Sequence, residues 1–180
     1  MQIQETKLNG VFIITPDVFK DERGFFFESY NKNKYEFLNN TFIQDNFSKS
    51  KYGVVRGLHY QVGEFAQGKL CQVIYGKVLD VAVDIRYGSP TYGQHVAAEL
   101  SDENHHQFWI PPGFAHGFSV LSEEVIFHYK CTALYSKKDE RAIRYNDPEL
   151  AIDWRIEDPV ISDKDKVSKM FSQIEKDFVL

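Results

Sequence analysis

The sequence has little of what marks extracellular, membrane-spanning or zinc-binding proteins. Its two cysteines, Cys71 and Cys131, are too few for a disulfide framework and lack metal-ligand spacing, so we expect both to be small buried apolar side chains. No stretch approaches the roughly 18 apolar residues of a membrane span, and residues 1–10 lack the apolar core of a signal peptide. We therefore predict a soluble, cytoplasmic protein without a membrane partner.

An excess of basic residues is also absent. The chain carries 21 Lys and Arg residues against 26 Asp and Glu residues, which gives a net charge of −5, and it has no basic stripe. General nucleic-acid binders carry a basic excess because they must neutralise phosphates. The charge balance therefore predicts no nucleic-acid partner.

Apolar and aromatic residues are plentiful. Hydrophobic residues make up 43% of the 180 positions, and the 15 Phe, 10 Tyr and 2 Trp supply a core that is rich in rings. The chain has no internal repeat, low-complexity tract or linker. Length and composition together predict one domain over residues 1–180.

The dominant pattern has a period of two, which is typical of strands. Residues 78–86 alternate, with Asp80 and Asp84 opposite an apolar face, and predict a half-buried strand. Residues 70–75 predict a second strand, joined to the first by a hairpin turn at Gly76. Further short strands are predicted at 125–131, where Val125, Phe127, Tyr129 and Cys131 share one face, and at 11–15, 24–29, 42–48, 54–61, 94–100, 105–110 and 141–145.

Helical patterns are scarce. Residues 31–40 could form two turns with Tyr35 and Leu38 facing inward. Helical spacing is clear only in the segment 162–178, at Val167, Met170, Phe171, Ile174 and Phe178. Many short strands with one C-terminal helix predict an all-β sandwich or barrel.

One loop suggests a particular kind of barrel. Residues 111–116 read Pro-Pro-Gly-Phe-Ala-His and resemble the second motif of the cupin superfamily of jelly-roll barrels, which directs a histidine inward. The first cupin motif needs His-x-His and a later Glu, but His59 is followed by Gln61, with Glu64 beyond it. One carboxylate does not replace the missing imidazole. The sequence therefore favours a barrel without a metal.

Polar residues crowd the predicted strand 54–61. Arg56 and His59, with Lys69 further on, place charge on what should be interior surface. Strict alternation would put Arg56 and His59 on opposite faces. A β-bulge near Gly57 is therefore predicted if both side chains face one pocket.

Six sequence motifs occur in order over about residues 8 to 170. Together they resemble the dTDP-4-dehydrorhamnose 3,5-epimerases, and they lie at residues 21–28, 44–46, 55–59, 67–70, 112–118 and 146–147.

The resemblance implies a metal-independent, homodimeric, cupin-type jelly roll without a cofactor. Its substrate would be dTDP-4-dehydro-6-deoxy-D-glucose, inverted at C3 and C5 to give dTDP-4-dehydro-L-rhamnose. Each inversion removes a proton beside the C4 ketone, forms an enolate and returns a proton on the other face. Such chemistry requires a base, an acid and a positive charge near the oxyanion.

The resemblance also assigns the catalytic roles. It makes His59 the base, Tyr129 the general acid and Lys69 the group that stabilises the enolate oxygen. Asp165 would orient His59, as carboxylates orient catalytic imidazoles elsewhere. The spacing from Ser162 to Asp165 also fits a helix capping box, and Asp163 is a rival partner.

The remaining matched positions are predicted to bind substrate. Arginines suit the diphosphate because a planar guanidinium bonds phosphate oxygens in pairs, and Tyr135 would stack on thymine. The full set is Arg23, Glu28, Gln44, Asn46, Arg56, Lys69, His116, Tyr135, Glu140 and Lys164.

Three other functions remain open from sequence. The first is a C3-only epimerase of another nucleotide-linked 4-keto-6-deoxy sugar, which would share the base and the acid. The second is a metal-dependent cupin dioxygenase, which would need the missing histidine. The third is a sugar-binding module without catalysis, which would have no use for an aligned base and acid.

Overall fold

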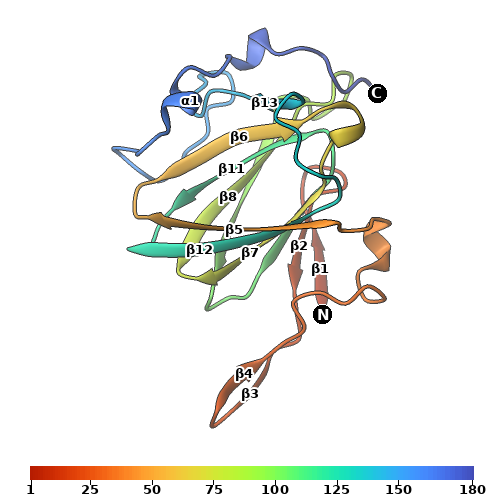
Figure 1. Ribbon diagram of the computed structural model, residues 1–180, viewed down its shortest axis with the longest axis vertical. Coiled ribbons are helices and arrows are strands. Elements are labelled where there is room, and N and C mark those ends of the chain that lie inside the picture. Colours follow the sequence, from red (N-terminus) through yellow and green to blue (C-terminus); the bar gives the residue numbers. More distant parts are fainter.

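Two β-sheets face each other in the computed structural model, which describes residues 1–180 (Figure 1). The six-stranded sheet has the order β1-β2-β10-β7-β12-β5, and the five-stranded sheet has the order β13-β6-β11-β8-β9. The first sheet comprises β1 (Gln2–Glu5), β2 (Phe12–Thr15), β10 (Gln107–Ile110), β7 (Lys69–Tyr75), β12 (Glu124–Cys131) and β5 (Gln44–Lys51). The second comprises β13 (Glu140–Ala142), β6 (Val55–Gln61), β11 (Phe114–Val120), β8 (Lys77–Asp84) and β9 (His95–Ser101). The all-β jelly-roll prediction is confirmed.

A third, two-stranded sheet stands apart from the sandwich. It pairs β3 (Phe19–Asp21) with β4 (Gly24–Phe26) and projects from the body as an arm (Figure 1). We call residues 19–26 the arm. Its aromatic side chains are exposed, including Phe19, Phe25 and Phe26.

The main core lies between the two sheets. Side chains of β12 at Val125 and Phe127 are fully buried there, and Tyr129 packs against the same cluster. This confirms the face predicted for residues 125–131. Figure 1 shows β12 and β8 in opposite layers, so this core holds the two sheets together.

Strand β8 is buried on both faces, so the prediction of a half-buried strand is wrong. Its apolar odd positions, such as Val81 and Val83, pack in a second core cluster on the outer side of the sheet. Asp80 and Asp84, expected on the exposed face, are fully buried. Alternation identifies two faces but does not say which one meets solvent, and here later segments cover the outer face.

The predicted hairpin between residues 70–75 and 78–86 is also wrong. Strand β7 pairs with β10 and β12, whereas β8 pairs with β11 and β9. The turn at Gly76 therefore carries the chain from one sheet to the other. From sequence alone, two consecutive strands joined by a turn give the same pattern whether they pair as a hairpin or belong to different sheets.

The continuous helix predicted over about 162–178 is not formed. Ser162 does cap a helix, because its Oγ accepts a hydrogen bond of 3.2 Å from the backbone N–H of Asp165, but α1 covers only Asp163–Lys166. A 3₁₀ turn, η3 (Phe171–Gln173), follows. Phe171 and Phe178 instead pack on the outer core of the five-stranded sheet, and this tertiary burial outweighs the local helical spacing.

Two shorter elements complete the chain. In segment 31–40 a 3₁₀ turn, η1 (Glu36–Leu38), forms, and Tyr35 and Leu38 face inward as predicted. A further turn, η2, covers Gly63–Phe65. No helix has the length and apolar character required to cross a membrane.

Candidate active site

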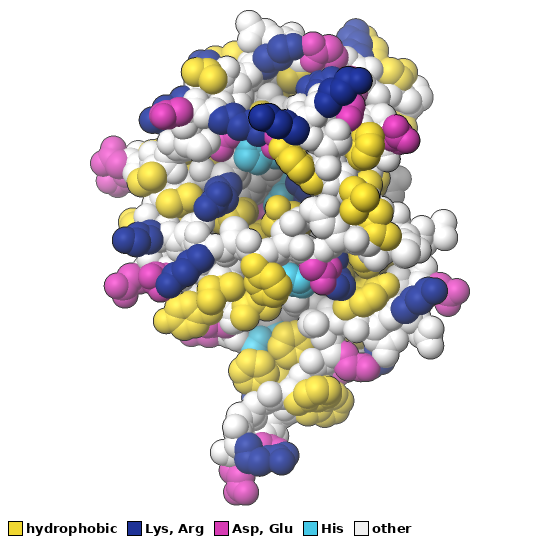
Figure 2. Space-filling view, viewed as in Figure 1, with side chains coloured by type: hydrophobic (Ala, Val, Ile, Leu, Met, Phe, Trp, Pro, Cys, Tyr) yellow, Lys and Arg dark blue, Asp and Glu magenta, His cyan; other side chains and the backbone are white.

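A cavity of about 140 Å³ lies between the sheets and collects polar side chains from both. A second hollow of about 390 Å³ shares Arg56 and His59 with it and continues to Lys164 and Asp165. Figure 2 shows histidine side chains set back in a hollow of this face, with lysine and arginine side chains around it. The inner cavity is lined by Ser48, Arg56, His59, Lys69, His116, Phe118 and Tyr129.

His59 is paired with Asp165. Nε2 of His59 lies 2.7 Å from Oδ1 of Asp165, a carboxylate that is 3% exposed. Because a carboxylate can only accept, Nε2 donates the proton and Nδ1 is left as the basic nitrogen. Burial alone would raise the pKa of Asp165, but the hydrogen bond and charge of His59 outweigh it and hold the pKa below its usual value. The rival Asp163 is exposed and pairs with Lys166.

A bulge brings Arg56 and His59 to the same cavity, as predicted. His116 of β11 is opposite His59 of β6, and Phe118 is opposite Arg56, so two residues of β6 face a single residue of β11. Gly57 makes this possible with a φ of +128°. A Cβ atom there would lie 2.5 Å from the Cα of Gly117, so no side chain fits.

Tyr129 and Lys69 reach the cavity from the opposite sheet. Tyr129 lies on β12 and Lys69 begins β7, with the ammonium 5.9 Å from the centre of the Tyr129 ring. Burial raises the pKa of Tyr129 to about 12, so its phenol keeps its proton at neutral pH. The imidazole of His59 and this phenol therefore enter the space between the sheets from opposite layers.

His116 forms a second imidazole–carboxylate pair deeper in the sandwich. Its Nε2 lies 2.6 Å from Oδ1 of Asp80, and both residues are buried. Burial lowers the pKa of His116, although the neighbouring Asp80 acts to raise it. Sequence reasoning missed Asp80 because it placed the polar face of β8 toward solvent.

The other polar residues predicted to bind substrate form a connected group at one end of the cavity. Glu140 accepts a 3.1 Å hydrogen bond from the Tyr135 hydroxyl and forms an ion pair with Lys164. Gln44 accepts a 2.9 Å bond from the Tyr135 backbone N–H and donates a 3.0 Å bond to Asn46. Asn46 lies opposite Tyr129 in the β5–β12 ladder, which connects this group to the cavity.

Arg23 and Glu28 are not brought to this cavity. Arg23 is on the arm, where its side chain is 85% exposed and pairs with Asp21. Glu28 pairs with Lys34 and accepts a hydrogen bond from Asn31. Within one copy of the chain, both residues therefore stand outside the site that the other predicted residues share.

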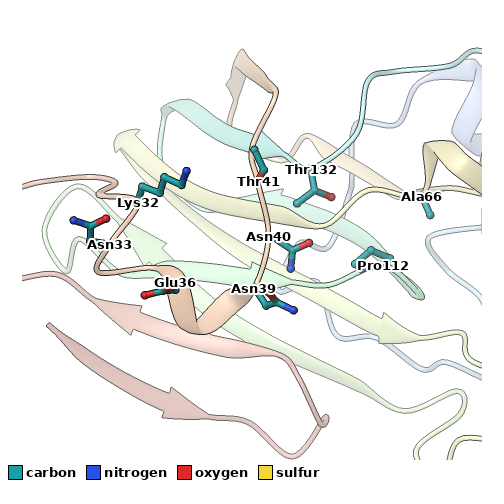
Figure 3. Close-up of a pocket in the computed structure, with 9 residues that line it drawn as sticks. All are labelled: Lys32, Asn33, Glu36, Asn39, Asn40, Thr41, Ala66, Pro112 and Thr132. Carbon is teal, nitrogen blue, oxygen red and sulfur yellow. The ribbon is translucent and has the colours of Figure 1, made fainter.

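A larger hollow of about 510 Å³ lies elsewhere, beside the segment 32–41 (Figure 3). None of the predicted site residues lines it. Figure 3 shows that the side chains around it are mainly the amides of three asparagines and the hydroxyls of two threonines, with Glu36 as the only acid and Lys32 as the only base. No imidazole or phenol is available there for proton transfer.

The histidine-and-glutamate set expected of a metal-dependent cupin does not assemble. Glu64 is exposed on η2, and neither it nor His59 belongs to a group of side chains close enough to share an ion. The only such group joins Cys71, Asp80 and His116.

Comparison with known proteins identifies the family. The family model described as dTDP-4-dehydrorhamnose 3,5-epimerase matches residues 5–173. A relative of that name from Pseudomonas aeruginosa is 51% identical over 176 residues, which cover 96% of this chain and 97% of the relative.

Solved structures give the same answer. The epimerase RmlC of Legionella pneumophila, crystallised with dTDP-4-keto-L-rhamnose, has a TM-score of 0.93 and 52% identity, covering 97% of this chain and 94% of its own. The 3′-monoepimerase ChmJ of Streptomyces bikiniensis has a TM-score of 0.87 but 27% identity, covering 93% of this chain and 86% of its own.

These similarities place the chain among the jelly-roll epimerases of nucleotide-linked sugars. Because the family model spans nearly all of the sequence, and named relatives share about half of its residues, the chain belongs to the dTDP-4-dehydrorhamnose 3,5-epimerase family.

Proposed function

We propose that this enzyme inverts C3 and C5 of dTDP-4-dehydro-6-deoxy-D-glucose and releases dTDP-4-dehydro-L-rhamnose. The observation that carries the proposal is the His59–Asp165 pair, which shares one cavity region with Tyr129 and Lys69 in a chain about half identical to named 3,5-epimerases. The C3-only alternative has weaker support, because the monoepimerase ChmJ shares far fewer residues with this chain.

His59 is the base in this proposal. With the Nε2 proton held by Asp165, the lone pair of Nδ1 takes the proton from the carbon beside the C4 ketone. The electrons of that C–H bond move into the enolate, whose oxygen becomes negative. Asp165 then stabilises the imidazolium, and its lowered pKa keeps it ionised for that role.

Lys69 and Tyr129 complete the cycle. The ammonium of Lys69 stabilises the enolate oxygen inside a narrow cavity, where a charge acts more strongly than in water. Tyr129 donates its phenolic proton to the carbon from the face opposite His59 and regains a proton from solvent. His59 releases the proton that it took to solvent and is then ready for the next inversion. An acid and a base on opposite sheets provide the two faces that an inversion requires.

The dTDP moiety is proposed to bind along the polar group at the end of the cavity. Arg56 and Lys164 would hold the diphosphate, and Tyr135, with a half-exposed ring, would stack on thymine. Gln44, Asn46, Glu140 and His116 would orient the sugar and base through hydrogen bonds.

We also propose a homodimer. The arm exposes three large aromatic side chains, an arrangement that favours contact with another protein surface. In a dimer, Arg23 and Glu28 would contact substrate in the cavity of the second copy, since both lie away from the cavity of their own chain. The expected cytoplasmic location is supported by two free cysteines, which persist most readily in a reducing compartment.

One experiment tests the function directly. The chelator-treated protein is incubated with dTDP-4-dehydro-6-deoxy-D-glucose in deuterated water, and the product is followed by NMR. Deuterium at both C3 and C5 is expected. Label at C3 alone would reduce the enzyme to a monoepimerase, and no label would exclude this substrate. A parallel sample of His59→Ala controls for exchange without enzyme catalysis.

A further inference from the structure

Three buried side chains with metal-binding atoms converge between the sheets, and one of them, His116, also lines the cavity. Cys71 comes from the six-stranded sheet, whereas Asp80 and His116 come from the five-stranded sheet, and their ligand atoms all lie within 4.8 Å of one another. Nε2 of His116 is central, at 2.6 Å from Oδ1 of Asp80 and 3.8 Å from Sγ of Cys71.

A second observation shows that this cluster is chemically incomplete. Oδ2 of Asp80 is buried and has no hydrogen-bond partner. Buried carboxylate oxygens are normally satisfied, because desolvating them without a partner costs free energy. Here an acceptor with free lone pairs stands beside a thiol and an imidazole.

We propose that Cys71, Asp80 and His116 bind one thiophilic divalent cation, of which Zn²⁺ is the best match. Thiolate, imidazole and carboxylate are all common zinc ligands, whereas Mg²⁺ and Ca²⁺ avoid sulfur. Zinc bonds of about 2.0–2.3 Å place tetrahedral ligands roughly 3–4 Å apart. The Cys71–His116 separation already fits, and the Asp80–His116 pair must open slightly.

Charge and protons balance in this site. The Cys71 thiol gives its proton to solvent as sulfur binds the cation. The proton that Nε2 of His116 donates to Asp80 also leaves, and Nδ1 takes one from solvent, so the imidazole stays neutral and binds through Nε2. The thiolate and the Asp80 carboxylate then offset the two positive charges. Burial raises the pKa of the Cys71 thiol, so without a cation the group stays neutral. Lys69 lines the cavity beside His116, and its positive charge opposes cation binding. In the proposal, the cation enters from this cavity, and a water fills the fourth position.

The site would make Zn²⁺ an inhibitor, a consequence that rests on the proposed function. His116 lines the catalytic cavity as well as the cluster. When Nε2 of His116 is bound to a cation, that nitrogen can no longer form a hydrogen bond with the sugar, and the bound water occupies part of the same space. Inhibition would be reversed by a chelator and would not be produced by Mg²⁺.

The test uses Co²⁺ as a spectroscopic probe of the chelator-treated full chain. Thiolate bound to Co²⁺ gives a charge-transfer band in the near ultraviolet, and a band that saturates at one equivalent is expected. Cys71→Val should abolish it. Cys131→Val is the matched control, because this cysteine is also buried on the same sheet but is not part of the cluster, and it should keep the band.

Turnover is measured in the same samples. Zn²⁺ should slow the wild type and Cys131→Val at least tenfold at concentrations that leave Cys71→Val unchanged. No thiolate band in the wild type, or a band that survives in Cys71→Val, would overturn the site. If Cys71→Val does not fold, Cys71→Ser removes the thiolate with less change in shape. A Cys71-dependent band without inhibition would support the site and count instead against the proposed role of His116 at the sugar.

Discussion

His59 and Asp165, which lie 106 residues apart in the sequence, meet through a 2.7 Å hydrogen bond beside the cavity. The pair joins a strand of the five-stranded sheet to the short helix α1, whose cap at Ser162 fixes the position of the carboxylate. The proton on Nε2 therefore has a fixed place, and Nδ1 is left as the nitrogen with a free lone pair. This relationship leads to the first two predictions.

Replacing His59 with Ala or Asn should abolish epimerisation at both carbons and leave the fold intact. A positioned general base contributes about 10²–10⁴-fold to the rate, and His59 serves both inversions in the proposed mechanism. Turnover followed by NMR, with circular dichroism as the control for folding, checks this. Near-native rates in His59→Ala would mean that another residue is the base.

Asp165→Asn should lower turnover by about 10²–10⁴-fold, because an amide can hold His59 in the wrong tautomer. Asp163→Asn is the matched control, two residues away on the same helix but exposed and paired with Lys166, and it should keep the wild-type rate. Circular dichroism checks that both variants fold, and a wild-type rate in Asp165→Asn would contradict the proposed role of the carboxylate.

Tyr129→Phe should slow reprotonation more than proton removal. The variant keeps the ring and His59 but loses the phenolic proton, so the substrate should exchange deuterium faster than product forms. Comparing label in recovered substrate with product yield measures this ratio. Because burial raises the pKa of Tyr129 to about 12, the acid stays protonated through neutral and mildly alkaline pH. An alkaline loss of rate near pH 10 in the wild type would argue against this residue as the acid.

Gly57→Ala should destabilise the protein by roughly 2–4 kcal/mol and disturb the site together with the fold. The new Cβ would meet the backbone of Gly117 at 2.5 Å. Gly24→Ala separates the steric clash from the backbone strain. Gly24 has a similar φ of +131°, but no atom lies within 4 Å of an added Cβ. The cost of Gly24→Ala should be smaller, about 1–2 kcal/mol, from the strained backbone conformation alone. Urea unfolding gives both values, and equal losses would show that the bulge has no steric requirement.

Acid stability should depend on Asp84. This buried carboxylate pairs with Arg86 and accepts bonds from Ser89 and Thr91. Burial raises its pKa, but these hydrogen bonds outweigh that effect and lower the pKa from 3.8 to about 2. The ionised form is therefore favoured in the folded state, by about 2 kcal/mol.

That contribution is complete above about pH 4 and is lost as the pH falls through about 2. Asp84→Asn should thus be less stable than wild type at pH 6, with the difference narrowing toward pH 2. Asp163→Asn, which changes an exposed carboxyl, should show no such trend. Unfolding free energies measured across this range would contradict the assignment if the difference stayed constant.

The sequence predicts the strands well and their partners poorly. Val125 to Cys131 alternate, and that strand forms with the predicted face inward. Strand β11 was not predicted at all, because Phe114 to Val120 include His116, Gly117 and Ser119 and show neither alternation nor a turn. This strand is buried because it is the central strand of the five-stranded sheet, and the local sequence does not reveal that position.

The site, too, was predicted in part. The family resemblance indicated His59, Tyr129, Lys69 and Asp165. The polar crowding around Gly57 predicted the bulge that the β6–β11 register contains. Asp80 was missed, since its environment depends on which face of β8 meets the opposite sheet. Arg23 and Glu28 are predicted together with the rest, but sequence order cannot show that the arm and the residues after it lie apart from the cavity.

The C-terminal segment has a consequence for biosynthesis. Asp165 sits at its start, and Phe171 and Phe178 further along cover the outer core of the five-stranded sheet. A growing chain that has only reached residue 160 already carries His59, Lys69 and Tyr129 but neither the partner of its base nor the cover of that sheet. In the proposed mechanism, the segment that completes the base is therefore also the segment that covers the outer core, so a chain that stops before Ser162 should lack both activity and full stability.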